Sequence, residues 1–176
     1  VSMATQKEPL SSTHPELAAQ ADGWDSRRVF SGSHKKVQWK CAYGHTWIAT
    51  VKDRSIGGGC PVCANKRVLA GFNDLATTLP DLASEADGWD PTTVVKFSHK
   101  KFGWRCAHGH KWITTVASRS SGRGCPICSG HKVLAGFNDL ATTHPELAGQ
   151  AHGWDPTSMP RGSDKKVSWI CERNHT

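Results

Sequence analysis

The sequence repeats itself every 65 residues, and this period constrains the fold more than any other feature. The motif Ala-Asp-Gly-Trp-Asp begins at Ala21 and Ala86, and a close variant begins at Ala151. A fixed period of this length is typical of tandem modules, each folding as one supersecondary unit. We therefore expect an N-terminal tail (residues 1–9), two complete modules (10–74 and 75–139) and a truncated third copy (140–176). The missing half of the third copy suggests that the chain is part of a longer polypeptide.

The composition indicates that each module folds with the help of cross-links or a metal ion. The 176 residues include 8 Trp and 7 Cys, and a small module of this kind has little aliphatic material for a core. The first residues lack the apolar segment of a signal peptide, which favours metal ligation over disulfides and a cytoplasmic location. No apolar run approaches the roughly 18 residues of a membrane span, so we expect no membrane association.

The residue pattern predicts a short helix and a β-hairpin in each module. In the first module, residues 10–21 are expected to form one helix, with Pro15 in its first turn. A turn at 33–36 then leads into alternating strands at 37–41 and 46–52. The predicted fold class is small α+β metal-stabilised modules, that is, tandem zinc-ribbon- or treble-clef-like hairpins with short connecting helices.

Two pairs of ligand-type residues recur with identical spacing in both complete modules. The first module contains Cys41-x3-His45 followed by Cys60-x2-Cys63, and the second repeats the pattern with Cys106, His110, Cys125 and Cys128. Two closely spaced pairs on tight turns can supply the four tetrahedral ligands of a structural zinc site. We therefore predict two complete Cys3His sites, each holding one Zn²⁺ and leaving no open position for catalysis.

The repeat also separates ligands from other histidines. A ligand should recur in every module, whereas His108 aligns with Tyr43 and is therefore not expected to bind metal. Cys171 and His175 form only half of a third site. The tryptophans Trp24, Trp39 and Trp47, with their repeats, are expected to form the module cores rather than stacking platforms for bases.

Basic residues recur at matched positions, and the formal net charge is +7. Cations of this kind can contact phosphates, and tandem modules would place such contacts along a duplex. We therefore expect nucleic acid, in particular double-stranded DNA, as the partner, although the same residues could be solvated turns. The predicted contacts are Lys35, Lys36, Arg54, Lys100, Lys101, Arg119, Arg123, Lys165 and Lys166. The alternatives are a zinc-stabilised protein-interaction scaffold, or the targeting region of a nuclease or defence protein whose catalytic domain is absent.

Catalytic motifs are missing from the sequence. It contains no P-loop, no nucleophile elbow and no His-Glu-x-x-His pattern. Its acidic residues fall at turns and helix ends, where capping is their ordinary role, and Asn73 or Asp74 is expected to cap the next helix. The chain is therefore not expected to be an enzyme.

The runs at 35–51 and 100–112, each followed by an arginine and a Cys-Pro-x-Cys turn, resemble the bacterial "probable zinc-ribbon domain" repeat family. The segment Asn-Asp-Leu-Ala-Thr at 73–77 is similar to that family's inter-module segment. The resemblance implies tandem zinc-ribbon or treble-clef modules, sometimes joined to endonuclease-like domains, with zinc on the two Cys3His sets. It also implies DNA binding or genome defence. The third copy departs from the family pattern because it lacks the second cysteine pair.

Overall fold

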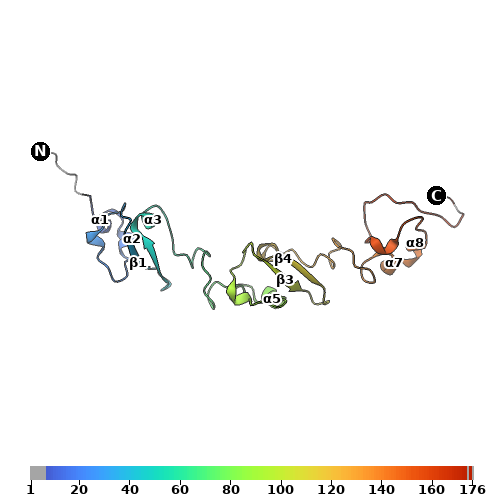
Figure 1. Cartoon of the computed structure of the whole chain (residues 1–176), viewed down its shortest axis with the longest axis horizontal. Coiled ribbons are helices and arrows are strands. Elements are labelled where there is room, and N and C mark those ends of the chain that lie inside the picture. The colour runs from blue at the N-terminus through green and yellow to red at the C-terminus, as the bar shows by residue number, and fades with distance from the viewer. Residues whose placement is uncertain (1–6, 174, 176) are drawn as a thin grey trace. The chain divides into compact units, whose positions relative to one another are not determined.

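The computed structural model describes residues 7–173 and residue 175, so residues 1–6 of the predicted tail lie outside the described residues. The described chain divides into two compact units. Figure 1 shows the order of its short helices and strands along the chain. The first unit consists of the described residues from 7 to 78 together with Thr92–Val95. The second consists of Leu79–Pro91 and the described residues from Lys96 onward. The predicted module boundaries at 74 and 139 follow the sequence repeat rather than this grouping.

The first module begins with two single-turn helices instead of the one predicted over residues 10–21. These are α1 (Leu10–Thr13) and α2 (Pro15–Ala18). A proline disfavours the helical conformation of the residue before it, and His14 accordingly has φ −144° and ψ 69°. The prediction of one continuous helix is therefore wrong, because Pro15 starts a second helix and ends the first.

The predicted hairpin is present. Strands β1 (Lys36–Lys40) and β2 (Thr46–Thr50) pair antiparallel, and Trp39 lies opposite Trp47. Both tryptophans are buried and alternate along their strands with exposed residues. The alternation that predicted the strands thus separates a core face from a solvent face.

A helix replaces the end of the predicted second strand. Helix α3 (Val51–Ser55) begins immediately after β2, and the hydroxyl of Thr50 accepts a hydrogen bond from the Asp53 amide at 3.0 Å. A threonine that caps the third helical residue is a standard helix start. The prediction that the strand extends to Lys52 is therefore wrong, although the Val51 side chain is buried in the core.

The core of the first module is small and built around tryptophan, as expected. Trp39 is completely buried, and Trp24 packs edge-on against it with ring centroids 5.0 Å apart. The Trp24 indole N–H donates to the Gln38 carbonyl at 2.6 Å. The remaining buried members of the cluster are Leu10, Val29, Val37, Trp47, Val51, Cys60 and Val62.

The second module repeats this arrangement. Strands β3 (Lys101–Arg105) and β4 (Lys111–Thr115) pair with Trp104 opposite Trp112, and α6 (Val116–Ser120) follows. The other short elements are α4 (Leu75–Thr78), α5 (Pro80–Ala83), α7 (Leu140–Thr143), α8 (Pro145–Ala148) and the 3-10 turns η1 (Ser26–Arg28), η2 (Pro91–Thr93) and η3 (Pro156–Ser158). Among the described residues, no helix has the length and apolarity that a bilayer crossing requires.

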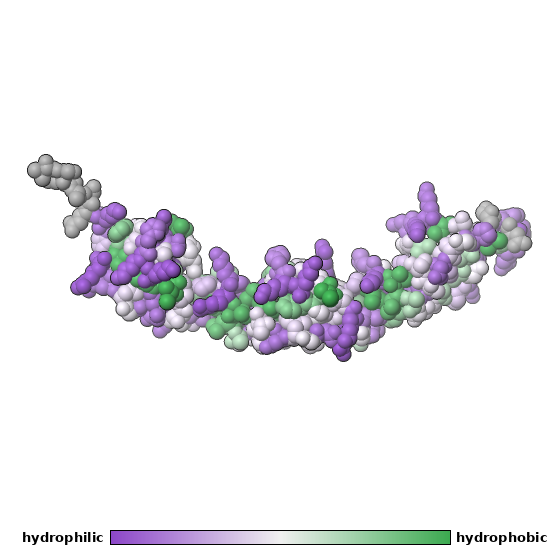
Figure 2. Space-filling model, viewed as in Figure 1, coloured by the Kyte–Doolittle hydropathy of each residue, from purple (hydrophilic) through white to green (hydrophobic). Residues whose placement is uncertain are grey.

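Cores of this size leave large apolar side chains at the surface, next to charged ones (Figure 2). Ile48 and Ile113 occupy the same register position in the two hairpins and are 70% and 75% exposed. Tyr43 and Ile56 are similarly exposed. These side chains are not among the buried residues of the module cores.

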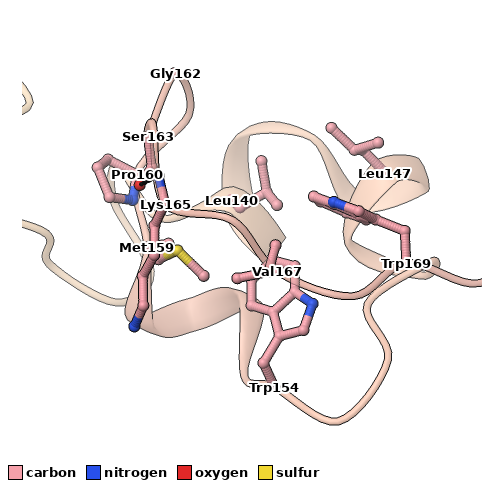
Figure 3. Close-up of a pocket in the computed structure, with 10 residues that line it drawn as sticks. All are labelled: Leu140, Leu147, Trp154, Met159, Pro160, Gly162, Ser163, Lys165, Val167 and Trp169. Carbon is pink, nitrogen blue, oxygen red and sulfur yellow. Dashed lines mark hydrogen bonds between the residues drawn. The ribbon is translucent and has the colours of Figure 1, made fainter.

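The third copy keeps one half of a module core. Figure 3 shows Leu140, Trp154, Val167 and Trp169 around a pocket of about 180 Å³. In the first module the equivalent residues pack against Val51 and Trp47 of the α3 and β2 segments. Among its described residues the third copy forms no strand, and Trp169 makes only an isolated bridge to Ala151.

Asp74 fulfils the predicted capping role. It is fully buried, and its carboxylate accepts hydrogen bonds from the amides of Thr77 and Gly71 and from the Thr77 hydroxyl, at 2.6–2.9 Å. Although burial opposes its charge, these donors hold the pKa of the Asp74 carboxyl below its usual value. Asp139 repeats the same three contacts in the next copy.

Replacing Asp74 with Asn should therefore destabilise the first unit by about 1–2 kcal/mol at neutral pH, because the amide offers one acceptor oxygen to three donors. Urea unfolding of the zinc-loaded chain, followed by tryptophan fluorescence, measures the change. Asp81→Asn is the matched control, since Asp81 is exposed. Equal stability of the two variants would contradict the capping role.

Candidate metal centre

The hairpin turn positions the first pair of ligands. Cys41 directly follows β1 and His45 directly precedes β2, and the Cys41 amide donates to the His45 carbonyl at 3.0 Å. Gly44 has φ +82°, which a residue with a side chain rarely adopts, and its amide donates to the Cys41 carbonyl at 2.9 Å. This tight turn brings both ligand side chains to one side of the hairpin tip.

A second turn positions Cys60 and Cys63. The Ala64 amide donates to the Cys60 carbonyl at 3.0 Å, which closes one helical turn around the pair. The side-chain amide of Asn73 donates to the Val62 carbonyl at 2.8 Å from within the protein interior. Asn73 was expected only as a possible cap; its structural role is to fix this turn, and Asn138 does the same for the second module.

The four donor atoms of the first module lie as close together as zinc requires. Their Sγ and Nδ1 atoms are all within 4.8 Å of one another. The Cys41 and Cys63 sulfurs are 3.8 Å apart, and His45 Nδ1 lies 3.4–3.8 Å from the three sulfurs. Tetrahedral zinc with its usual bond lengths separates two sulfur ligands by about 3.8 Å, and a sulfur from a nitrogen by about 3.6 Å. The donor set therefore fits Zn²⁺ in both chemistry and spacing.

The second site has the same geometry. The Cys106 and Cys128 sulfurs are 3.8 Å apart, and His110 Nδ1 lies 3.3–3.7 Å from the three sulfurs. The two complete Cys3His predictions are confirmed as clusters, with four protein donors in each.

Electrostatics explains why these thiols require a cation. Desolvation and the neighbouring thiols of Cys60 and Cys41 together raise the pKa of the Cys63 thiol to about 12. Burial also opposes ionisation of Cys41, but the amides of Tyr43 and His45 donate to its sulfur and lower its pKa. Three adjacent thiolates therefore resist joint ionisation, and a divalent cation removes this penalty.

An aromatic contact that sequence analysis missed supports each ligand histidine. The Phe72 ring packs edge-on against His45 with centroids 4.4 Å apart, and Phe137 contacts His110 at 4.3 Å. The repeated Gly-Phe-Asn-Asp segment was the signal for this role, because it supplies the phenylalanine, the turn-fixing asparagine and the capping aspartate together. Ligand orientation by neighbouring groups is a general feature of metal sites.

Cys171 and His175 reproduce only the first half of this site. The Cys171 amide donates to the His175 carbonyl at 3.0 Å, and the His175 amide donates to the Cys171 sulfur at 3.4 Å. In the described part of the chain they belong to neither group of metal-ligand residues.

Two residues predicted to contact nucleic acid are buried in the module cores. Arg54 is only 7% exposed, and its guanidinium lies over the rings of Trp39 and Trp47 at 5.1 and 5.2 Å. It donates to the Gly58 carbonyl and to Gln20 Oε1. Burial excludes phosphate contact, so the assignment of Arg54 to the nucleic-acid surface is corrected to a core cation–π role.

Arg119 receives the same correction in the second module. It is 8% exposed and lies over Trp104 and Trp112 at 5.4 and 5.3 Å. It donates to the Arg123 carbonyl and forms an ion pair with Glu85 at 2.5 Å. The remaining predicted contacts are exposed: Lys35, Lys36, Lys100, Lys101, Arg123, Lys165 and Lys166.

The hairpin, the two ligand turns and the Cys3His clusters define a class of small zinc-binding finger modules arranged in tandem. The family model described as "Probable Treble clef zinc finger domain" matches the chain twice, over residues 19–66 and 83–131, and the chain belongs to this family. This finding favours the treble clef over the zinc ribbon, which the sequence had left open. No curated protein sequence matches the chain.

Removing one buried ligand should remove one zinc ion. The intact chain should hold two zinc ions on its complete sites, and Cys60→Ala or Cys125→Ala should each reduce this number to one. The affected module should unfold, because structural zinc supplies folding free energy directly. Metal analysis and tryptophan fluorescence, before and after EDTA treatment, give both readouts. Cys171→Ala is the control and should leave both sites loaded; an unaltered fold after zinc removal would contradict the structural role.

The stability of the second module should depend little on whether the partner of Arg119 is charged. Gln20 accepts from Arg54 in the first module where Glu85 accepts from Arg119 in the second. Glu85→Gln should therefore cost less than about 1 kcal/mol in stability, because the hydrogen bond survives and Glu85 is partly exposed. Glu85→Ala should cost about 1–3 kcal/mol, because the buried guanidinium loses its side-chain acceptor and keeps only the Arg123 carbonyl. If urea unfolding gives the same loss of unfolding free energy for Glu85→Gln and Glu85→Ala, the charge of Glu85 matters and its hydrogen bond does not.

Proposed function

We propose that the chain binds nucleic acid, most simply double-stranded DNA, through lysine-bearing turns that precede the first strand of each copy. The observation that carries this proposal is a pair of exposed lysines that recurs in all three copies. Two adjacent exposed lysines stand at the same position of every copy: Lys35 with Lys36, Lys100 with Lys101, and Lys165 with Lys166. Treble-clef zinc fingers often bind nucleic acid, which supports the assignment.

These turns have a defined backbone. The amide of the first lysine donates to a serine hydroxyl two residues earlier in every copy, at 3.2 Å for Lys35 and 3.3 Å for Lys100 and Lys165. In the first module the Lys35 carbonyl also accepts from the Val51 amide at the start of α3, at 3.2 Å. The lysines therefore project from a fixed turn, which reduces the entropy lost when they contact phosphates.

The turn lysines are among the exposed cations that form no ion pair in the described part of the chain. Ion pairs occupy Arg27 and Arg28 on Asp25, and Arg105 and Lys111 on Asp87. In the part of the chain that the structure describes, no ion pair involves any of the six turn lysines. Unpaired surface cations are the groups that release counterions from DNA.

We further propose a cytoplasmic, bacterial protein without catalytic activity. The thiols must stay reduced to bind zinc, and the described cysteines form no disulfides. Each zinc site has four protein donors, which supports a structural ion rather than a catalytic one.

A protein-interaction scaffold is the second candidate function. The exposed Ile48 and Ile113 support it, because they repeat at one register position on the outer hairpin face. A scaffold would depend on these isoleucines and not on the turn lysines.

DNA titrations at several salt concentrations test the proposal. Changing Lys35, Lys36, Lys100 and Lys101 to Ala should weaken binding to a random-sequence duplex at about 50 mM salt. The log–log salt slope should fall by up to about 0.9 for each lysine that contacts phosphate. Fluorescence anisotropy of a labelled duplex provides the affinities.

The matched control changes four cations that already have carboxylate partners, namely Arg27, Arg28, Arg105 and Lys111, to Gln. Both variants lose four positive charges. A larger loss of DNA affinity in the turn-lysine variant therefore shows that the position of these lysines matters, and not only the net charge. If both variants weaken binding equally, the affinity depends on net charge and not on the position of the turn lysines. Absence of binding by the intact chain at about 50 mM salt would leave the scaffold as the better candidate.

A further inference from the structure

A fifth potential donor lies beside the second zinc site. His108 Nδ1 is 3.6 Å from the Cys128 sulfur, close to the 3.3 Å that separates the ligand nitrogen of His110 from the same sulfur. Cys128 is the exposed cysteine of its cluster, whereas Cys125 is buried. The extra imidazole therefore lies next to the ligand that is most accessible to solvent.

Aromatic packing holds this imidazole in place. The His108 ring stacks on His110 with centroids 6.0 Å apart and an interplanar angle of 20°, and it contacts Phe137 at 5.9 Å. In the first module Tyr43 holds the same position, 6.3 Å from His45 and 5.9 Å from Phe72. Both modules thus place a ring beside the site, but only that of His108 carries a nitrogen able to bind zinc.

We propose that His108 is an alternative zinc ligand that replaces Cys128 when that thiolate is lost. In this ligand exchange the Nδ1 lone pair of neutral His108 takes the coordination position of the Cys128 sulfur, and the set changes from Cys3His to Cys2His2. Zinc uses both sets in structural sites. The inference concerns metal retention and is independent of nucleic-acid binding.

The consequence is an asymmetry between two modules that otherwise match. Among the described residues of the first module, the ring in the matching position beside the exposed Cys63 is that of Tyr43, and a phenol is not among the usual zinc ligands. The second module should therefore keep its ion after a change that releases zinc from the first.

Substitution of the two exposed cysteines in the full chain tests this asymmetry. Every variant carries Cys171→Ala, so that zinc counts refer to the two complete sites. After dialysis against a zinc chelator, Cys128→Ala should retain two zinc ions and Cys63→Ala only one. The second-site affinity in Cys128→Ala should exceed the first-site affinity in Cys63→Ala by at least about tenfold, since even outer-shell partners contribute 10- to 100-fold.

Two further variants identify His108 as the donor. His108→Ala alone should retain two zinc ions, while His108→Ala combined with Cys128→Ala should retain one. With cobalt(II) as the probe, Cys128→Ala should keep the visible bands of a tetrahedral site while its sulfur-to-metal absorption falls.

Transfer of the imidazole to the first module provides a test that does not depend on the folding of Cys128→Ala. Adding Tyr43→His to Cys63→Ala should restore the second zinc ion. The proposal is overturned if Cys128→Ala retains one zinc ion, or if it retains two after His108 is also removed. A hydrogen bond from His108 to the Cys128 thiolate, without ligand exchange, would give the first of these results.

Discussion

The attraction between one divalent cation and three adjacent thiolates is the interaction on which each module depends. The buried cluster of the first module has eight members, and one of them, Cys60, is itself a zinc ligand. The hairpin tip and the Cys60–Cys63 turn meet at the donor cluster. Without a cation the three sulfurs resist ionisation, so the metal joins these two segments where apolar burial is too small to do so.

In each module, one buried arginine packs over two tryptophan rings of the core. Arg54 and Arg119 lie over cross-strand tryptophan pairs, and each donates to a backbone carbonyl in the loop that leads to the second cysteine pair. A buried arginine is stabilised here by ring quadrupoles and hydrogen bonds together. It connects the inner face of the hairpin to the chain just before Cys60 or Cys125, so that core and metal site stabilise each other.

The repeat explains why so much could be predicted from the sequence. A residue that recurs with the same spacing has a role in every copy, so the sequence predicts the ligands, the hairpin, the tryptophan core and a helix cap at Asn73 or Asp74. Arg54 was misassigned because burial of a charge depends on tertiary contacts that spacing does not encode. The helix at Val51 was missed because strand alternation continued across it, although Thr50 and Asp53 carried a capping signal. His108 was excluded because it lacks a counterpart, yet packing on Phe137 brings it to the site.

If the chain binds nucleic acid as proposed, the charge distribution within one hairpin favours one of its ends for phosphate contacts. A zinc ion with three thiolates and a neutral imidazole carries a net charge of about −1. This charge lies at the tip, whereas Lys35 and Lys36 lie at the other end of β1, a strand of five residues that spans about 17 Å. At physiological ionic strength charges interact weakly beyond about 8 Å. A negative tip would therefore neither attract phosphates nor weaken the lysine turn, which agrees with the proposed placement of phosphate contacts at the end of the hairpin remote from zinc.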